Sequence, residues 1–376
     1  MSSTWILEDT TLRDGEQSPG VAFSKQTKIE IHDALVEAGV RWIEVGIPAM
    51  GGDELQTLQW LLGRGSAATL VAWNRGRRED IEQSLALGFS AIHIGLPTSN
   101  LHLEQSIGRD REWLLREAVE LVKRVKDAGA FVSISAEDVG RSDINFVIEY
   151  AGAIRDAGAD RMRLSDTVGI LLPHEYAQIV RKVSAVGIPV QCHTHNDYGL
   201  AVANTLAGLE AGASYFHVTV NGIGERAGMP DFASVAMLLQ HRLGVDLGID
   251  MSRLIGLSQL VAKACGLPTL PWQPVVGANV FAHESGIHGK GMLADTRTFE
   301  PFSPDVVAGT RRYVAGKHSG RAVIRHLLSE AGVSIDDRYL DPCLSSVRQI
   351  SMRRGNALSP HELVSVYEGI TAARST

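Results

Sequence analysis

The sequence predicts an α/β fold, namely a (β/α)8 TIM barrel with a C-terminal irregular connector and a small helical region. Three observations lead to this class. Short β-rich runs alternate with longer amphipathic runs from residue 5 to about residue 245, which is typical of a parallel sheet. The alternation repeats eight times, and eight units in roughly 250 residues is the usual size of such a barrel. An open doubly wound sheet is disfavoured because no GxGxxG turn follows the first β-rich run.

The expected strands are short and rich in β-branched and aromatic residues, and they span 5–9, 42–47, 68–73, 91–96, 130–135, 160–165, 188–195 and 214–220. Helices are expected between them. Residues 25–39 and 111–129 show the helical pattern most clearly, because their apolar residues recur on one helical face. Many of these amphipathic runs close on a glycine, which is a common residue just after a helix end.

The pattern changes beyond Leu247. Residues 251–264, 318–331 and 359–372 look helical, whereas residues 266–316 are rich in Gly, Pro and His and show little periodicity. We therefore expect three parts, which are a barrel catalytic domain at 1–250, a connector or lid at 251–316 and a small helical region at 317–376. No regulatory domain is expected after them.

The composition of the chain narrows the class of protein. Of 376 residues, 44% are hydrophobic and 21% are charged, as in soluble globular proteins. A net charge of −7 without a basic run argues against a nucleic-acid partner. The sequence contains no run of about 18 apolar residues, so no membrane span is expected. The N-terminus lacks a signal-peptide pattern, and three widely spaced cysteines fit reduced thiols, so a cytoplasmic location is expected.

Polar side chains gather at the C-terminal ends of the expected strands, where barrel enzymes place their chemistry. The stretch DTTLRDGEQ, at residues 9–17, follows the first strand and brings carboxylates and an arginine close together. Comparable residues lie in or just after most other strands: Glu44, Thr98, Ser99, His102, Ser135, Glu137, Asp138, Ser165, Asp166, Thr167, His193, His195, Asn196, Asp197, Asn221, Glu225 and Arg226. Such an accumulation at one end of a barrel predicts an enzyme site.

The sequence HTH at 193–195 predicts a metal site. Residues i and i+2 of a strand face the same way, so both imidazoles are expected in one space. Two histidines and a carboxylate are a common set for divalent metals, and Asp14 can supply the carboxylate. The alternative is a polar strand end whose histidines bind backbone groups. The ligand types do not distinguish Mg, Mn and Zn.

Other residues have two interpretations each. Glu44 is alone in an apolar strand, so either it pairs with an Arg such as Arg13 or it belongs to the pocket; simple exposure at the strand end is the alternative. Arg13 is next to a predicted metal ligand, which favours a role in stabilising an anion over a surface ion pair. His283 and His288 lie outside the barrel, where solvated loop histidines are the alternative to a functional role.

Several stretches resemble one known family, the barrel-type acyl-CoA-condensing synthases that include isopropylmalate, homocitrate and citramalate synthases. They are DTTLRDGEQ, HTHNDYGLAVAN, NGIGERAG, FAHESGIHGK and GKHSGR, and the resemblance covers nearly the whole chain. Hydroxymethylglutaryl-CoA lyases and pyruvate-carboxylating enzymes are more distant relatives. Within the family, the chain is most similar to the homocitrate synthases of nitrogen-fixing bacteria.

The resemblance implies an activity. It is a metal-dependent Claisen condensation of acetyl-CoA with 2-oxoglutarate, an acyltransferase reaction that gives homocitrate and CoA for nitrogenase cofactor synthesis. The alternatives are an isopropylmalate or citramalate synthase, an acyl-CoA lyase, or an inactive metal-binding barrel. An intertwined homodimer is also implied, in which the C-terminal region is exchanged between subunits.

The resemblance also implies roles for individual residues. The metal ligands are Asp14, His193 and His195. Arg13 would stabilise the developing enolate or alkoxide, and His288 would act as an acid or base from the neighbouring subunit. Glu137, Thr167, Gln17 and Glu44 match residues of the family's pocket, Glu137 as a catalytic residue and the other three as substrate contacts. From their places at strand ends, His102 and Ser135 are further candidate substrate contacts.

Three positions depart from the family pattern. Met229 stands where the fuller GERAGN motif has an Asn. Phe299 stands where lysine-pathway homocitrate synthases have a Tyr, eleven residues after the catalytic His. Ser133 stands where those enzymes have an Arg for the distal carboxylate of 2-oxoglutarate. His102 and Arg75 are therefore candidates to bind that carboxylate.

Overall fold

A computed structural model describes residues 5–373, and its first eight strands form one closed parallel barrel. Strand β1 pairs with both β2 and β8, which closes the sheet. The predicted barrel is confirmed, and each of the eight expected segments overlaps a strand. The strands are β1 (Ile6–Asp9), β2 (Trp42–Gly46), β3 (Thr69–Arg75), β4 (Ala91–Gly95), β5 (Phe131–Ala136), β6 (Arg161–Asp166), β7 (Val190–Thr194) and β8 (Tyr215–Val218).

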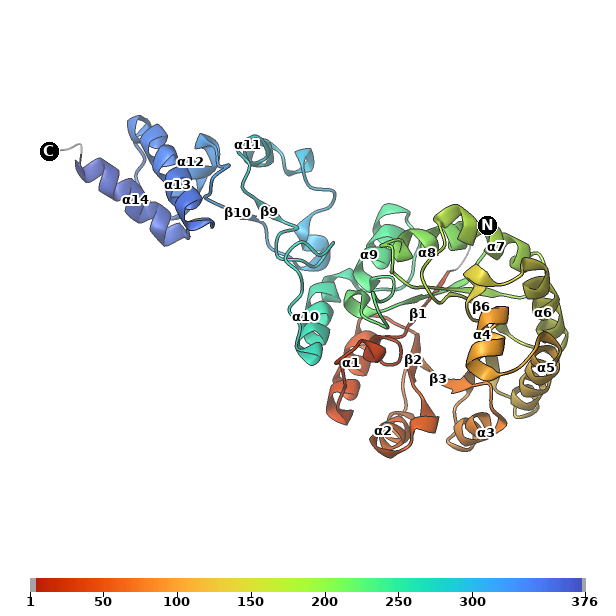
Figure 1. Cartoon of the computed structure of the whole chain (residues 1–376). Coiled ribbons are helices and arrows are strands. Elements are labelled where there is room, and N and C mark those ends of the chain that lie inside the picture. Colours follow the sequence, from red (N-terminus) through yellow and green to blue (C-terminus); the bar gives the residue numbers. More distant parts are fainter. Residues whose placement is uncertain (1–4, 374–376) are drawn as a thin grey trace. The chain divides into compact units, whose positions relative to one another are not determined.

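Helices between the strands form a ring around the barrel (Figure 1). In α5 the residues Leu114, Leu121 and Val125 are buried on one face, as their spacing predicts. Its first turn is capped by the side chain of Asp110, which accepts a hydrogen bond from the backbone N–H of Trp113. The helices of this ring are α1 (Lys25–Glu37), α2 (Gly52–Gly63), α3 (Arg78–Ala86), α4 (Asn100–His102), α5 (Arg111–Asp127), α6 (Ile144–Asp156), α7 (Pro173–Ser184), α8 (Ala201–Glu210) and α9 (Phe232–Ala236).

The interior of the barrel is polar and charged. Arg161 and Arg163, which alternate along β6, are fully or almost fully buried and bind carboxylates from β1 and β2. The intervening residues Met162 and Leu164 are also buried. Helices cover the outer face of each strand, and the other strands of the barrel cover its inner face. The strand sequences are therefore mostly apolar, except for the charged residues that meet inside the barrel.

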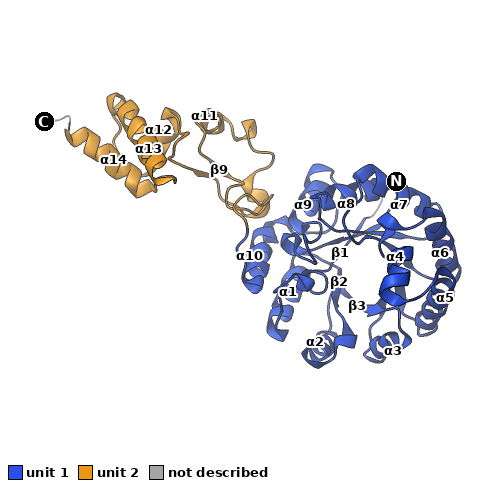
Figure 2. Cartoon of the chain, in the orientation of Figure 1, with its two compact units in different colours: residues 1–269 blue, residues 270–376 orange. Residues whose placement is uncertain are grey.

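The chain divides into two compact units, residues 1–269 and 270–376 (Figure 2). The first unit extends past residue 250 because α10 (Leu254–Cys265) packs on the barrel. Ser258 donates from its hydroxyl to Asn221 Oδ1 at 2.5 Å, and Asn221 Nδ2 donates to the backbone carbonyl of Ser258 at 2.9 Å.

The second unit has its own core, in which Val323, Leu340 and Leu363 are buried. The segment expected to be irregular contains a short parallel sheet and a helix, and residues 340–354 form a helix that the sequence did not predict. Its buried residues have helical spacing, but Ser, Cys and Pro weaken the apolar pattern. The elements are β9 (Ala282–His283), β10 (Arg312–Tyr313), α11 (Gly286–Ala294), α12 (Arg321–Glu330), α13 (Leu340–Arg354) and α14 (Pro360–Ala373). Among the described residues, no helix is long and apolar enough to cross a bilayer.

Candidate active site

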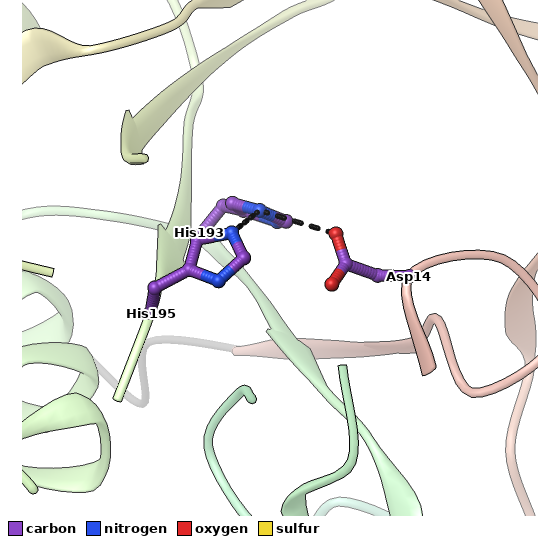
Figure 3. A group of neighbouring side chains, drawn as sticks. All are labelled: Asp14, His193 and His195. Carbon is purple, nitrogen blue, oxygen red and sulfur yellow. Dashed lines mark hydrogen bonds and ion pairs between the residues drawn. The ribbon is translucent and has the colours of Figure 1, made fainter. Parts of the chain in front are cut away.

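Asp14, His193 and His195 meet at the C-terminal end of the barrel. One donor atom from each of the three lies within 4.8 Å of the others, and all three side chains are buried. The Nε2 atoms of His193 and His195 are 3.3 Å apart, and His193 Nε2 is 3.7 Å from Asp14 Oδ2 (Figure 3). Asp14 comes from the turn after β1, and the histidines come from β7 and the residue following it, so strands far apart in the sequence build one cluster.

These three residues fit a divalent cation. Burial lowers the pKa of His193 well below its usual range and also lowers that of His195, so both rings are neutral and offer lone pairs. Asp14 Oδ1 is buried and has no hydrogen-bonding partner among the described residues. A buried carboxylate oxygen without a partner is costly, and a cation between it and two neutral imidazoles would remove that cost.

A chain of hydrogen bonds behind the cluster orients His193. Its Nδ1 is 2.8 Å from Nδ1 of His217, and Nε2 of His217 is 3.0 Å from Glu8 Oε1. The carboxylate can only accept, so the proton of neutral His217 lies on Nε2 and its Nδ1 accepts from Nδ1–H of His193. Arg163 Nη2 also approaches His217 Nε2, but at the longer distance of 3.3 Å. His193 therefore keeps its Nε2 lone pair free for a metal, as ligand histidines require.

Glu8, Glu44 and His217 form a second group with metal-ligand spacing. Here, however, the cations are already supplied by arginines. Arg161 lies 2.6 Å from Glu8, and Arg163 lies 2.5 Å from Glu44. Although burial alone would raise it, the pKa of Glu8 is lowered to about 2, chiefly by Arg161 and then by His217. The group is a set of paired charges and not a second metal site.

Arg13 lies between the candidate metal ligands and this buried network. Its Nη1 donates to Asp14 Oδ2 at 2.7 Å and to Gln17 Oε1 at 3.3 Å, and its Nε donates to Glu44. Glu44 thus has the arginine partner that its position in the sequence required. Against the effect of burial, Arg13 and then Arg163 hold the pKa of Glu44 well below its usual range, so this carboxylate stays charged and fixes both guanidinium groups.

A cavity of about 260 Å³ contains most of the predicted site residues. It is lined by Arg13, Asp14, Gln17, Trp73, His93, Glu137, Arg163, Ser165, Thr167, His193, His195, Glu225 and Arg226. Burial raises the pKa of Glu137, which gives this carboxyl group a proton affinity suited to acid–base work. Thr167 accepts a hydrogen bond from the backbone N–H of Asp138 at 2.8 Å, which ties the ends of β5 and β6 together.

Four predicted residues lie elsewhere. Glu44 is behind Arg13, and Ser135 is buried between strands, where its hydroxyl accepts from Leu96 N at 3.1 Å. His102 lines a neighbouring cavity of about 590 Å³, as does Arg75. His288 belongs to the second unit, where it is exposed and stacks on Phe299 with ring centroids 4.2 Å apart.

Sequence reasoning missed three residues that line the cavity, namely Trp73, His93 and Arg163. Each lies inside a strand and not at its end, so its position along the strand does not mark it as a site residue. One feature of the sequence could have indicated His93 and Arg163. Each is a polar residue at an alternate position of a mostly apolar strand, and alternate positions of a closed barrel face either its interior or the surrounding helices.

Comparisons with known proteins show the family to which the chain belongs. Residues 4–261, more than half of the chain, match the family model described as HMGL-like, and residues 275–355 match the model described as homocitrate synthase post-HMGL domain-like. A 2-phosphonomethylmalate synthase of Streptomyces rubellomurinus is 58% identical over 99% of this chain and 100% of that protein. The chain belongs to this family of condensing synthases.

Other members of the synthase family are also similar over nearly their full length. The 2-isopropylmalate synthase 2 of Caldanaerobacter subterraneus subsp. tengcongensis is 44% identical, over 97% of this chain and 95% of that protein. Homocitrate synthase 1 of a Nostoc species is 42% identical, over 96% of each. The hydroxymethylglutaryl-CoA lyase structure from Pseudomonas aeruginosa, at 22% identity, shares the fold with a TM-score of 0.64 over 71% of this chain and 95% of that one.

The chain is therefore similar to synthases of several different products, and homocitrate synthase is one of them. The family expected from the sequence motifs is confirmed, whereas the particular 2-oxo acid is not decided by it, since members with three different product names align along almost the whole chain.

Proposed function

We propose that the chain catalyses a Claisen condensation in which the methyl carbon of acetyl-CoA attacks the keto carbon of a 2-oxo acid. The observation that carries the proposal is the placement of Asp14, His193 and His195 beside Arg13 in one cavity. A divalent cation such as Mg, Mn or Zn, held by the first three, would supply Lewis-acid polarisation of the ketone.

Other residues of the cavity take the remaining roles in the reaction. Arg13 places a guanidinium next to Asp14, where it stabilises the negative charge that develops on the substrate oxygen. Glu137, with its raised pKa, accepts the proton that leaves the methyl group of acetyl-CoA. Gln17 and Thr167 line the same cavity and bind the carboxylate end of the 2-oxo acid. Water then hydrolyses the thioester, and CoA leaves.

For the substrate we propose 3-phosphonopyruvate first. The relative at 58% identity is named for the product 2-phosphonomethylmalate. Removing an acetyl-derived CH2–COOH group from that product leaves 3-phosphonopyruvate as the 2-oxo acid. The alternative is 2-oxoglutarate, which is favoured by the motifs shared with homocitrate synthases and by the matching C-terminal domain model.

A panel of 2-oxo acids tests this proposal. Each acid is incubated with acetyl-CoA and a divalent metal, and free CoA is measured with a thiol reagent. We expect the highest kcat/KM with 3-phosphonopyruvate. Preference for 2-oxoglutarate would instead establish the homocitrate reaction, and preference for 2-oxoisovalerate or pyruvate would establish an isopropylmalate or citramalate synthase. If none of the acids leads to release of CoA, a condensing activity is refuted.

We further propose that His288 serves the active site of a second copy of this chain. In the second unit, His288 is exposed beside Ile287, which is 80% exposed, so this helix presents an apolar side chain and an imidazole at its surface. Mixing an Arg13→Ala subunit with a His288→Ala subunit tests the exchange. Activity should reappear in the mixture, because one of its two sites would then be intact. Two inactive variants that stay inactive when mixed and refolded together would contradict the exchange.

A further inference from the structure

His93 is a fully buried residue of β4 that lines the same cavity as the candidate metal ligands. Its Nδ1 lies 3.0 Å from the hydroxyl of Ser133, whereas its Nε2 has no hydrogen-bonding partner among the described residues. A buried polar atom without a partner is costly, so it is rarely kept unless something outside the chain completes its hydrogen bonding.

The hydroxyl of Ser133 sets the tautomer of His93. In the described part of the chain, Ser133 Oγ has two hydrogen-bonding neighbours, Nε of Arg161 at 3.1 Å and Nδ1 of His93. Arg161 can only donate, so the Ser133 hydroxyl accepts from it and has its own proton to give. Of the two neighbours, only Nδ1 of His93 can accept that proton. Burial, followed by Arg163, lowers the pKa of His93 well below its usual range, so the neutral ring carries its hydrogen on Nε2.

We propose that Nε2–H of His93 binds the distal anionic group, phosphonate or carboxylate, of the 2-oxo acid. This inference rests on the proposed condensation and names the part of the substrate that selects it. The hydrogen-bond chain from Arg161 through Ser133 to His93 carries the influence of a buried cation to a neutral donor. Such charge-assisted chains strengthen the last donor and suit an anionic acceptor.

The other candidates are less suited to this role. Arg75 is engaged by Asp80 through two hydrogen bonds, at 2.6 and 2.9 Å, and both it and His102 line the neighbouring cavity. Arg163 does line the active-site cavity, but its Nη2 and Nε are bound to Glu44 and Gln191. His93 is the member of this group with an unpaired, buried polar atom.

Binding measurements separate this role from a structural one. Titration calorimetry on the Mn²⁺-loaded protein, without acetyl-CoA, compares 3-phosphonopyruvate with 2-oxobutyrate, in which a methyl group replaces the phosphonate. We expect His93→Leu to lower the preference for 3-phosphonopyruvate roughly 10- to 100-fold, as for loss of one hydrogen bond to a charged group. His93→Gln, whose amide N–H is placed near the lost Nε2–H, should recover part of that preference. Ser133→Ala should weaken the preference less than His93→Leu, since it frees the tautomer without removing the ring.

The results distinguish this inference from the proposed function. If the wild-type protein prefers the phosphonate and His93→Leu keeps the same preference, the role of His93 is refuted while the condensation stands. Equal losses for both acids in a folded His93→Leu protein refute it as well, because they indicate a general distortion of the cavity. If the wild-type protein binds neither acid, the proposed function and this inference fail together.

Discussion

Replacing His217 tests the hydrogen-bond chain that orients His193. In His217→Leu, Nδ1–H of His193 loses its acceptor at 2.8 Å, so the ring is free to move its proton to Nε2 and the metal would lose a lone pair. Groups that orient ligand histidines contribute roughly 10- to 100-fold to metal affinity, which equals about 1.4–2.7 kcal/mol. We expect a loss in this range and not a complete loss, because Asp14 and His195 remain.

The fold should survive the same substitution. Glu8 loses the N–H of His217 but keeps Arg161 at 2.6 Å and Arg163 at 3.6 Å, so its charge stays paired. Loss of the two buried hydrogen bonds of His217, to His193 and to Glu8, then costs about 1–3 kcal/mol of unfolding free energy for each bond. A thermal melt of the metal-free protein separates this loss from the change in metal affinity.

The assay is titration of Mn²⁺ into metal-free protein by calorimetry. His217→Asn is the matched control, since its amide oxygen takes the place of Nδ1 and can still accept from His193. His195→Ala removes a proposed ligand and marks the lower limit. The reasoning would be refuted by a folded His217→Leu protein that binds Mn²⁺ as tightly as the wild type, or by a His217→Asn protein that is no better than His217→Leu.

Three further predictions concern the residues around the cluster. Arg13→Ala should lower kcat by roughly 10²–10³ while elemental analysis finds the metal content unchanged; a near-wild-type rate would show that another group stabilises the anion. A Cβ added at Gly224 would lie 2.9 Å from Asp14 Oδ1, so Gly224→Ala should weaken Mn²⁺ binding, whereas Gly256→Ala, whose Cβ meets nothing within 4 Å, should not; equal affinities would contradict the placement of Asp14. Burial raises the pKa of Asp9 from 3.8 to about 7, so the folded state binds this proton more tightly than the unfolded state does. The free energy of unfolding therefore falls as pH rises from about 4 to 7, by at most about 1.4 kcal/mol per pH unit. Asp9→Asn should therefore gain unfolding free energy relative to the wild type between pH 4 and 7 in denaturant titrations, and a constant difference across that range would show that Asp9 does not titrate there.

Much of the fold followed from local patterns in the sequence. Each expected strand overlaps an observed one because alternation of β-rich and amphipathic runs reflects burial that every unit repeats. The helix at 340–354 was missed because its buried positions include Cys343 and Ser351, which do not register as an apolar stripe. Its burial depends on the neighbouring helices of the second unit, and not on its own composition.

The candidate site followed from the sequence only in part. The two-residue period of a strand places His193 and His195 on one side, and the convergence of strand ends in a barrel brings Asp14 to them. The roles of His93 and Arg163 were not predictable in the same way. A single polar residue within an apolar strand gives no information about which of the seven other strands it faces.

The sequence by itself determined the class of fold, the family, and the end of the barrel where the chemistry lies, because these depend on periodicity and on short motifs. Only the tertiary structure decided which charges are paired and which polar atoms are left to bind a ligand. Glu8 and His217 are 209 residues apart in the chain, and Glu44 and Arg163 are 119 apart, yet both pairs are in hydrogen-bonding contact inside the barrel. Their pKa values and tautomers depend on distances between strands, and closure of the sheet sets those distances.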